Sequence, residues 1–151
     1  MVAMSGGIDS TVTALMLHHE GYEVLGITMK TWDYATSGGN TTSKKETGCC
    51  NIDSFNDARQ AAVHHGFPHY ILDIRDEFGD FVVENFVEEY LAGRTPNPCV
   101  MCNTHIKWRA LLKRADALGC DYIATGHYAQ VHQHSNGRYF IRKGLDETKD
   151  Q

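Results

Sequence analysis

The stretch V-A-M-S-G-G-I-D-S-T-V-T-A-L, residues 2–15, decides the fold of this chain. A short apolar run leads into two glycines, and Val12 and Leu15 then recur at helical spacing. This order predicts a strand, a tight turn and a helix over residues 10–20, which Gly21 ends. The opening apolar run, residues 2–4, is too short for a core strand, so we expect a trimmed N-terminus.

The turn in this stretch has the features of an anion site. Gly6 and Gly7 let the backbone turn sharply and approach a ligand closely. Ser5 and Ser10 add hydroxyl groups, and the following helix directs its free N–H groups and the positive end of its dipole to the same place. The turn lacks the lysine of G-x-x-x-x-G-K-[ST] and is not G-x-G-x-x-G. We predict a phosphate site, with a tight turn capped by serines as the alternative.

Strands and helices alternate along the rest of the chain. The predicted strands are residues 24–29, 69–73 and 122–125. The predicted helices are residues 53–65, a third that includes 78–91, and a fourth that ends near residue 118. Such alternation predicts a parallel sheet covered on both faces, with ligands outside the carboxyl ends of its strands. Asn136-Gly137, between two alternating stretches, predicts a terminal hairpin.

Two segments between the predicted strands have distinctive patterns. In the third helix, one face carries large apolar side chains, which we expect to be buried, and glutamates occupy the other face. The apolar residues are Phe78, Phe81, Val82, Phe86, Tyr90 and Leu91. Residues 31–52 are polar and rich in Gly, Ser and Thr, and they are longer than an ordinary connection, which predicts a mobile loop over a site.

Length and composition limit the class of protein. The chain has 151 residues, of which 42% are hydrophobic and 22% charged, as suits one globular domain. Five cysteines, an odd number, without a charged and apolar leader predict a reducing, cytoplasmic location. No apolar run approaches the roughly 20 residues of a membrane span, so we expect no membrane association.

Positive charge gathers in one segment of an otherwise acidic chain. The net charge is −5, yet residues 93–115 contain five of the 14 basic residues and none of the 19 acidic ones. We call these five the basic strip: Arg94, Lys107, Arg109, Lys113 and Arg114. The strip predicts a nucleic-acid surface. A solvated helix face is the alternative.

The segment of residues 93–115 also contains the C-x-x-C pair Cys99 and Cys102. A structural disulfide is disfavoured in a reducing compartment. A metal clip completed by Cys49 and Cys50 stays an alternative, although adjacent cysteines chelate poorly. Cys102 precedes a helix and several cations, which favour a thiolate, so we predict that it is a nucleophile. Cys120, between a glycine and a strand, is expected to be an inert core thiol.

Four motifs, in order, carry a resemblance to a known family. S-G-G-I-D-S at 5–10 resembles the PP-loop of ATP pyrophosphatases, which cleave ATP between its α and β phosphates and form adenylates. Three further motifs make the chain similar to the tRNA-specific 2-thiouridylase family. They are G-R-T-P-N-P-x-x-x-C-N at 93–103, A-T-G-H-Y at 124–128 and G-L-D-x-x-K-D-Q at 144–151.

The resemblance implies a fold and a domain organisation. The fold is a three-layer α/β/α domain with a parallel sheet, like the adenine nucleotide alpha hydrolases, with a small terminal hairpin. Residues 1–151 then form the catalytic PP-loop domain, and the central and C-terminal β domains of the family are absent. We expect such a fragment, taken alone, to be inactive.

The resemblance also implies site residues. The ATP site falls on Ala3, Met4, Ser5, Gly6, Gly7, Ile8, Asp9, Ser10, Met29 and Gly126. The target base, the wobble uridine of a tRNA anticodon, meets Asn97, Pro98 and Cys99. Cys102 is the catalytic cysteine. Contacts with tRNA fall on Lys149, Asp150 and Gln151, to which the basic strip adds Lys107 and Arg109.

Three further side chains each keep two interpretations. Asp9 binds Mg²⁺ or braces the turn, and we favour Mg²⁺ because ATP needs its charge offset. His127 hydrogen-bonds the local backbone or touches the ATP phosphates. Trp108 stacks on a base or, as helical spacing favours, packs against the domain.

In the resembling family, ATP adenylates the 2-oxygen of the uridine, and sulfur from a persulfide on a second cysteine replaces it. That cysteine lies beyond this chain, and the sulfur comes from a cysteine desulfurase or a sulfur-relay protein. The catalytic cysteine attacks carbon 2 or forms a disulfide that releases the sulfur. Cys99 replaces an aspartate of many members; a thiol is a weaker acid, so its role is open. Two other functions stay as alternatives: a PP-loop ligase for a small carbonyl substrate, and a metal-clipped nucleic-acid module.

Overall fold

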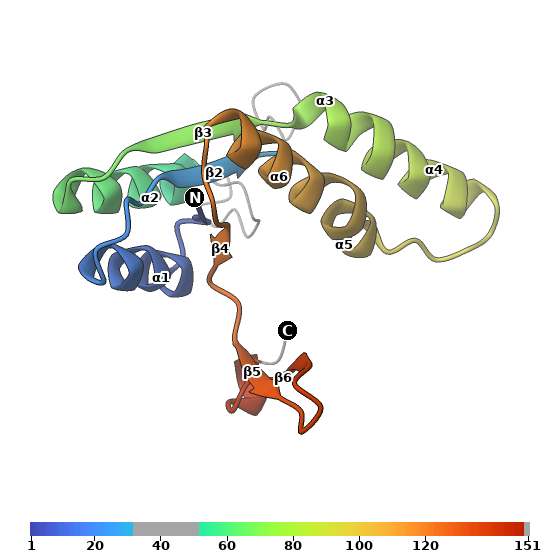
Figure 1. The fold of residues 1–151 in the computed structure, drawn as a ribbon. Helices are drawn as coiled ribbons and strands as arrows, with labels where there is room; N and C mark the ends of the chain where they lie inside the picture. The colour runs from blue at the N-terminus through green and yellow to red at the C-terminus, as the bar shows by residue number, and fades with distance from the viewer. Residues whose placement is uncertain (32–51, 150–151) are drawn as a thin grey trace.

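A computed structural model describes residues 1–31 and 52–149 of the chain. Its centre is a four-stranded parallel sheet in the order β3-β2-β1-β4. The strands are β1 (Val2–Ala3), β2 (Gly26–Lys30), β3 (His69–Asp73) and β4 (Ala124–Thr125). Helices cover both faces, which gives the predicted three-layer α/β/α architecture (Figure 1). The predicted fold class is confirmed.

Strand β1, which has only two residues, lies inside the sheet between β2 and β4. Val2 is opposite Gly26 on one side and Ala124 on the other, and its side chain is 1% exposed. Hydrogen bonds from both neighbours hold it, so two paired residues suffice for a central strand. The expectation that this segment was too short for the core was therefore wrong.

One face of the sheet carries α1 (Ile8–His19) and α2 (Ile52–His65). Three alanines on these helices are completely buried, which lets both helices approach the strands closely. This core consists of Val2, Met4, Ala14, Val24, Ala58, Ala62 and Phe67. The first helix begins two residues earlier than predicted, so Ile8 and Asp9 belong to its first turn.

The other face carries two interrupted helices. The first joins α3 (Arg75–Phe78), a π-helical segment (Gly79–Val83) and α4 (Glu84–Leu91). The second joins α5 (Pro98–Met101), a π-helical segment (Cys102–Lys107) and α6 (Trp108–Ala117). Both bury side chains against β2 and β3. The core on this face consists of Met1, Ile27, Leu72, Ile74, Val82, Cys102, Ile106, Leu111 and Ala115.

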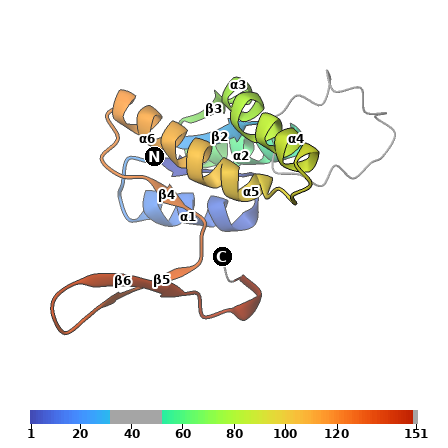
Figure 2. The same cartoon turned by 90° about the vertical axis from the view of Figure 1, so that its right-hand side faces the viewer.

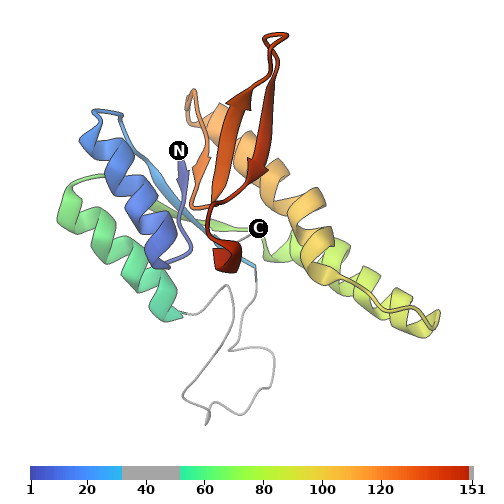
Figure 3. The same ribbon diagram turned by 90° about the horizontal axis from the view of Figure 1, so that it is seen from below.

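The apolar face predicted for the third helix is only partly buried. Val82 is 2% exposed, but Phe86 is 39%, Tyr90 57% and Leu91 83% exposed. At about 3.6 residues per turn, Leu91 lies about half a turn from Val82, so the two side chains do not share one face of the helix. In addition, α4 extends away from the sheet (Figure 3). The expectation of one continuous buried face was therefore wrong.

The chain ends in a hairpin outside the main sheet. β5 (Ala129–Gln133) and β6 (Tyr139–Lys143) pair antiparallel around Gly137, whose φ of 83° requires glycine. Figure 2 shows the hairpin apart from the three layers. A 3₁₀ turn, Glu147–Lys149, follows it. The hairpin prediction is confirmed, and the predicted mobile loop lies almost entirely outside the described residues.

Candidate active site

The strand order reverses between β1 and β4. From β1 the chain moves outward to β2 and β3, and then returns to β4 on the opposite side of β1. Ligands of open parallel sheets bind outside the carboxyl ends of the strands at such a reversal. Two predicted site segments leave the sheet there, residues 5–7 after β1 and residues 126–128 after β4.

The two glycines of the turn after β1 have different surroundings. Gly6 has a φ of 80°, and a Cβ placed on it would lie 2.2 Å from the carbonyl oxygen of Ser54. Gly6 is therefore required by packing against the first turn of α2 as well as by its backbone conformation. At Gly7 the nearest atom to such a Cβ is Ser5 Oγ, at 3.4 Å, so this part of the turn is open.

The serine hydroxyls shape the turn. Ser10 Oγ donates to the carbonyl oxygen of Gly7 at 3.1 Å and accepts from the N–H of Ser5 at 3.1 Å, and Ser10 is 6% exposed. Ser10 is therefore an internal brace rather than an exposed ligand. Ser5 is exposed, and in the described chain no side chain caps α1 at Gly7. The first turn of α1 is left with the positive end of a helix dipole at an open glycine.

The loop after β4 packs directly on this turn. A Cβ placed on Gly126 would lie 2.6 Å from the backbone nitrogen of Ser10 and 2.8 Å from its Cα. Only glycine allows this approach, since the atoms it would meet belong to the backbone. The A-T-G-H-Y and S-G-G-I-D-S motifs, more than a hundred residues apart, thus meet at the first turn of α1.

His127 links this loop to α6. Its Nδ1 is hydrogen-bonded to Thr125 Oγ1, so its local partner is a side chain and not the predicted backbone group. Its ring lies over Trp108, with 6.4 Å between the centroids and 30° between the planes. Trp108 is 45% exposed, so it packs on the domain with one part open to solvent. The contact brings the start of α6, between Lys107 and Arg109, to the same edge of the sheet.

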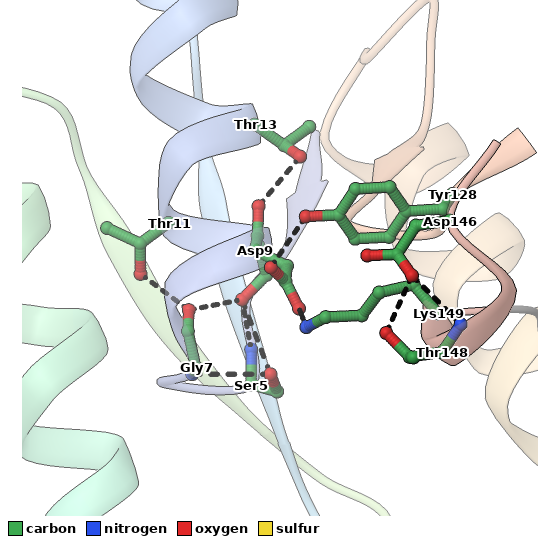
Figure 4. A network of polar contacts seen from close by, with 10 residues as sticks. Ser5, Gly7, Asp9, Thr11, Thr13, Tyr128, Asp146, Thr148 and Lys149 are labelled. Atoms are coloured by element: carbon green, nitrogen blue, oxygen red, sulfur yellow. Dashed lines mark hydrogen bonds and ion pairs between the residues drawn. The ribbon is translucent and has the colours of Figure 1, made fainter. Parts of the chain in front are cut away.

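Asp9 is the centre of a polar cluster at this edge (Figure 4). Its Oδ1 accepts a hydrogen bond from the hydroxyl of Tyr128 at 2.8 Å, and its Oδ2 lies 3.0 Å from Lys149 Nζ. The bond from Tyr128, followed by that from Lys149, lowers the pKa of Asp9, and the Asp9 carboxylate raises the pKa of Lys149. Tyr128 was not among the predicted site residues, although its position after a strand end was a signal.

The carboxylate of Asp9 suits Mg²⁺ chemically, because this ion prefers oxygen ligands. In the structure both of its oxygens accept hydrogen bonds, so Asp9 braces the site. Among the described residues, no group of three His, Cys, Asp or Glu side chains could hold a metal ion, and Cys49 and Cys50 lie outside them.

The segment around the C-x-x-C pair begins a helix. Asn97 Oδ1 accepts from the N–H of Val100 at 3.2 Å, and Pro98 occupies the first helical position, as is typical of a helix start. Cys99 is exposed. Cys102 is 5% exposed and packs in the core on the face opposite α1. The structure therefore does not bring the thiol of Cys102 to the open turn at Gly6 and Gly7.

The remaining predicted residues fall into three groups. Met29, near the end of strand β2, is partly buried against the same core as Cys102. Within the basic strip, Arg94 pairs with Glu89 at 2.6 Å, whereas Arg109 is exposed and belongs to no ion pair of the described chain. Asp150 and Gln151 lie outside the described residues. None of the described helices is long and apolar enough to cross a membrane.

Comparison with known proteins agrees with these motifs. The 2-thiouridylase MnmA of Amoebophilus asiaticus is 69% identical over all 151 residues, that of Cytophaga hutchinsonii 70%, and that of Salinibacter ruber 63% over 152 aligned positions. Each is described as tRNA-specific. The chain spans 39% of the length of the first of these relatives and 40% of the second.

A family model described as "tRNA methyl transferase HUP domain" matches residues 1–151. The sheet order, the glycine turn after β1 and the loop after β4 are the structural features that accompany this match. Because the family model covers every residue, the chain belongs to the tRNA methyl transferase HUP domain family.

Proposed function

We propose that the chain is the catalytic N-terminal part of an ATP-dependent tRNA 2-thiouridylase that works in the cytoplasm. The observation that carries this proposal is the packing of Gly126 on Ser10, which joins the two loops at the reversal of strand order. The names of the relatives support the substrate and the reaction. Since the chain spans about 40% of them, the activity is assigned to a longer protein.

ATP binds with its phosphates at the turn that includes Gly6 and Gly7. The N–H groups at the start of α1 and the helix dipole attract the phosphate oxygens, and the open Gly7 admits close approach. The nucleotide extends from residues 3–10 towards Gly126 and Met29. Mg²⁺ offsets the phosphate charge, and Asp9 is the residue that would hold it.

The tRNA approaches from the start of α6. Lys107 and Arg109 flank Trp108, whose ring contacts His127 beside the phosphate turn, so positive charge lies next to the nucleotide site. The target uridine meets the helix start at Asn97 and Pro98, where Cys99 is exposed. The segment 149–151 adds further contacts.

The uridine 2-oxygen attacks the α-phosphorus of ATP, and pyrophosphate leaves. The terminal sulfur of a persulfide, loaded by a sulfur donor onto a cysteine outside this chain, attacks carbon 2 of the uridine, and the 2-oxygen departs with AMP. The Cys102 thiolate then attacks the inner sulfur of the persulfide, which breaks the S–S bond and leaves the terminal sulfur on the base as 2-thiouridine. Cys102 and the loaded cysteine are left as a disulfide, which a thiol reductant reduces before the next turnover. Because Cys102 is buried, this role requires the helical segment that contains it to open. Its π-helical turn suits such a change, since π-helical turns are associated with functional sites.

The test uses the full-length protein with unmodified tRNA, ATP and a persulfide donor. We expect pyrophosphate release that requires the tRNA, and 2-thiouridine in the product. Cys102→Ser should abolish 2-thiouridine and leave ATP binding intact, whereas Cys120→Ser, at a half-buried position, should retain activity. Pyrophosphate release without tRNA would indicate a ligase for a small substrate. Full thiolation by Cys102→Ser would remove Cys102 from the mechanism.

A further inference from the structure

The phosphate turn lacks positive side chains of its own. The first 29 residues contain no lysine or arginine, and the turn has no counterpart of the P-loop lysine. A lysine nevertheless reaches this turn from the other end of the chain. Lys149 Nζ lies 3.0 Å from Oδ2 of Asp9, in the first turn of α1.

Lys149 is held in this place by local structure. Asp146 Oδ1 accepts from the N–H of Thr148 at 2.8 Å and from its hydroxyl at 2.6 Å, and Asp146 O accepts from the N–H of Lys149 at 3.1 Å. These bonds order the 3₁₀ turn that presents the lysine (Figure 4). The ammonium also lies 5.6 Å from the centroid of the Tyr128 ring.

Tyr128 joins the lysine and the turn. Its hydroxyl donates to Asp9, and its Cβ lies 3.1 Å from a Cβ placed on Gly144, so the chain before and after the hairpin packs together here. Three segments of the chain therefore converge on one carboxylate at the open side of the turn. The ammonium contacts Asp9 and the Tyr128 ring, yet the Lys149 side chain is 44% exposed and can change partner.

We propose that Lys149, which the resemblance assigns to tRNA, is the phosphate-binding cation of the nucleotide site, and that Asp9 holds it beside the turn until the nucleotide arrives. The inference rests on the proposed function. A triphosphate carries more negative charge than one carboxylate and offers several acceptor oxygens, so it competes for the ammonium. Lys149 then pairs with phosphate oxygens, and Asp9 is released from the ion pair.

The experiment measures ATP and AMP binding to the full-length protein by calorimetry, in the presence of Mg²⁺. Lys149→Met removes the charge and retains an unbranched stem over Tyr128, and Lys149→Arg retains the charge. The matched control is Arg142→Ala. Arg142 is exposed on strand β6, so this substitution also removes one positive charge, but at a position outside the turn.

We expect Lys149→Met to weaken ATP binding by about 10-fold or more, as for the loss of one charge-assisted hydrogen bond, and AMP binding much less. The ATP affinity of Lys149→Arg should stay within about threefold of the wild-type affinity, and the affinity of Arg142→Ala should equal that of the wild type. Unchanged ATP binding in Lys149→Met would overturn the inference, as would an equal loss for ATP and AMP, which indicates a structural latch. A wild-type protein that binds no ATP would instead refute the proposed function, and the inference with it.

Discussion

Cys99 and Cys102 show how strongly one residue's environment depends on tertiary packing. They are three positions apart at the start of one helical segment, yet Cys99 is exposed and Cys102 is 5% exposed. The C-x-x-C spacing did not predict this difference in exposure. A spacing states which side chains are near each other, but not which face of the helix packs against the sheet.

The two cysteines should react differently with a thiol reagent. In the native chain, we expect iodoacetamide to modify Cys99 quickly and Cys102 only after addition of denaturant, because reagent must reach the sulfur. Peptide mass spectrometry over a time course measures both rates. Comparable rates at both positions in buffer would show that the segment opens readily without a substrate.

His69 should make stability depend on pH. Its Nε2 is 2.8 Å from Thr28 Oγ1, and partial burial, followed by the charge of Arg59, lowers its pKa from the ordinary 6.5. The unfolded chain therefore binds the proton more readily, and stability should fall as pH decreases below about 6.5, until the folded-state pKa is passed. Urea unfolding at about pH 7 and about pH 5.5 should show a smaller difference for His69→Gln than for the wild type. Equal differences would exclude His69 as the cause.

At the scale of elements, the apolar pattern of the third helix did not mark one buried face. We expected Val82 and Leu91 to share that face, but their exposed fractions are 2% and 83%. At about 3.6 residues per turn, Leu91 lies about half a turn from Val82, so regular spacing already places the two side chains on opposite sides of the helix. The strands, whose type depends on short apolar runs, were predicted more closely than these helical faces.

The same helix offers a matched pair of substitutions. Val82→Ala should lower the free energy of unfolding by about 2 kcal/mol, because it removes buried methyl groups and leaves a cavity. Leu91→Ala should change it by less than about 0.5 kcal/mol, because the side chain is mostly in solvent. Guanidinium unfolding followed by circular dichroism measures both. A large loss for Leu91→Ala would indicate that Leu91 is buried in solution.

At the scale of the whole molecule, the site depends on contacts between distant parts of the chain. Gly126, after β4, touches Ser10 in α1, and Lys149, near the end, pairs with Asp9. No single element contains the site. Its geometry follows from β1 and β4 being neighbours in the sheet, which places their carboxyl ends side by side.

Gly126→Ala should therefore disturb the site as a whole. The added methyl would lie 2.6 Å from the backbone of Ser10 and would force β4 and α1 apart. We expect ATP affinity to fall by about 10-fold or more and stability to fall by about 1–3 kcal/mol, as for overpacking. The control is Gly79→Ala, where no atom lies within 4 Å of the added methyl and φ is not positive. Calorimetry and thermal unfolding test the pair, and equal behaviour would show that the contact at Gly126 tolerates a side chain.

The sequence by itself determined the alternating order of strands and helices, the glycine turn, the terminal hairpin and the family resemblance. These depend on local spacing, on backbone conformations that glycine allows, and on motifs, all of which are properties of short segments. Only the tertiary structure decided that two residues suffice for a central strand, that Cys102 is buried, and that Tyr128 and Lys149 meet Asp9. The physical reason is that burial and long-range pairing depend on which elements become neighbours, and the spacing within one segment does not contain that information.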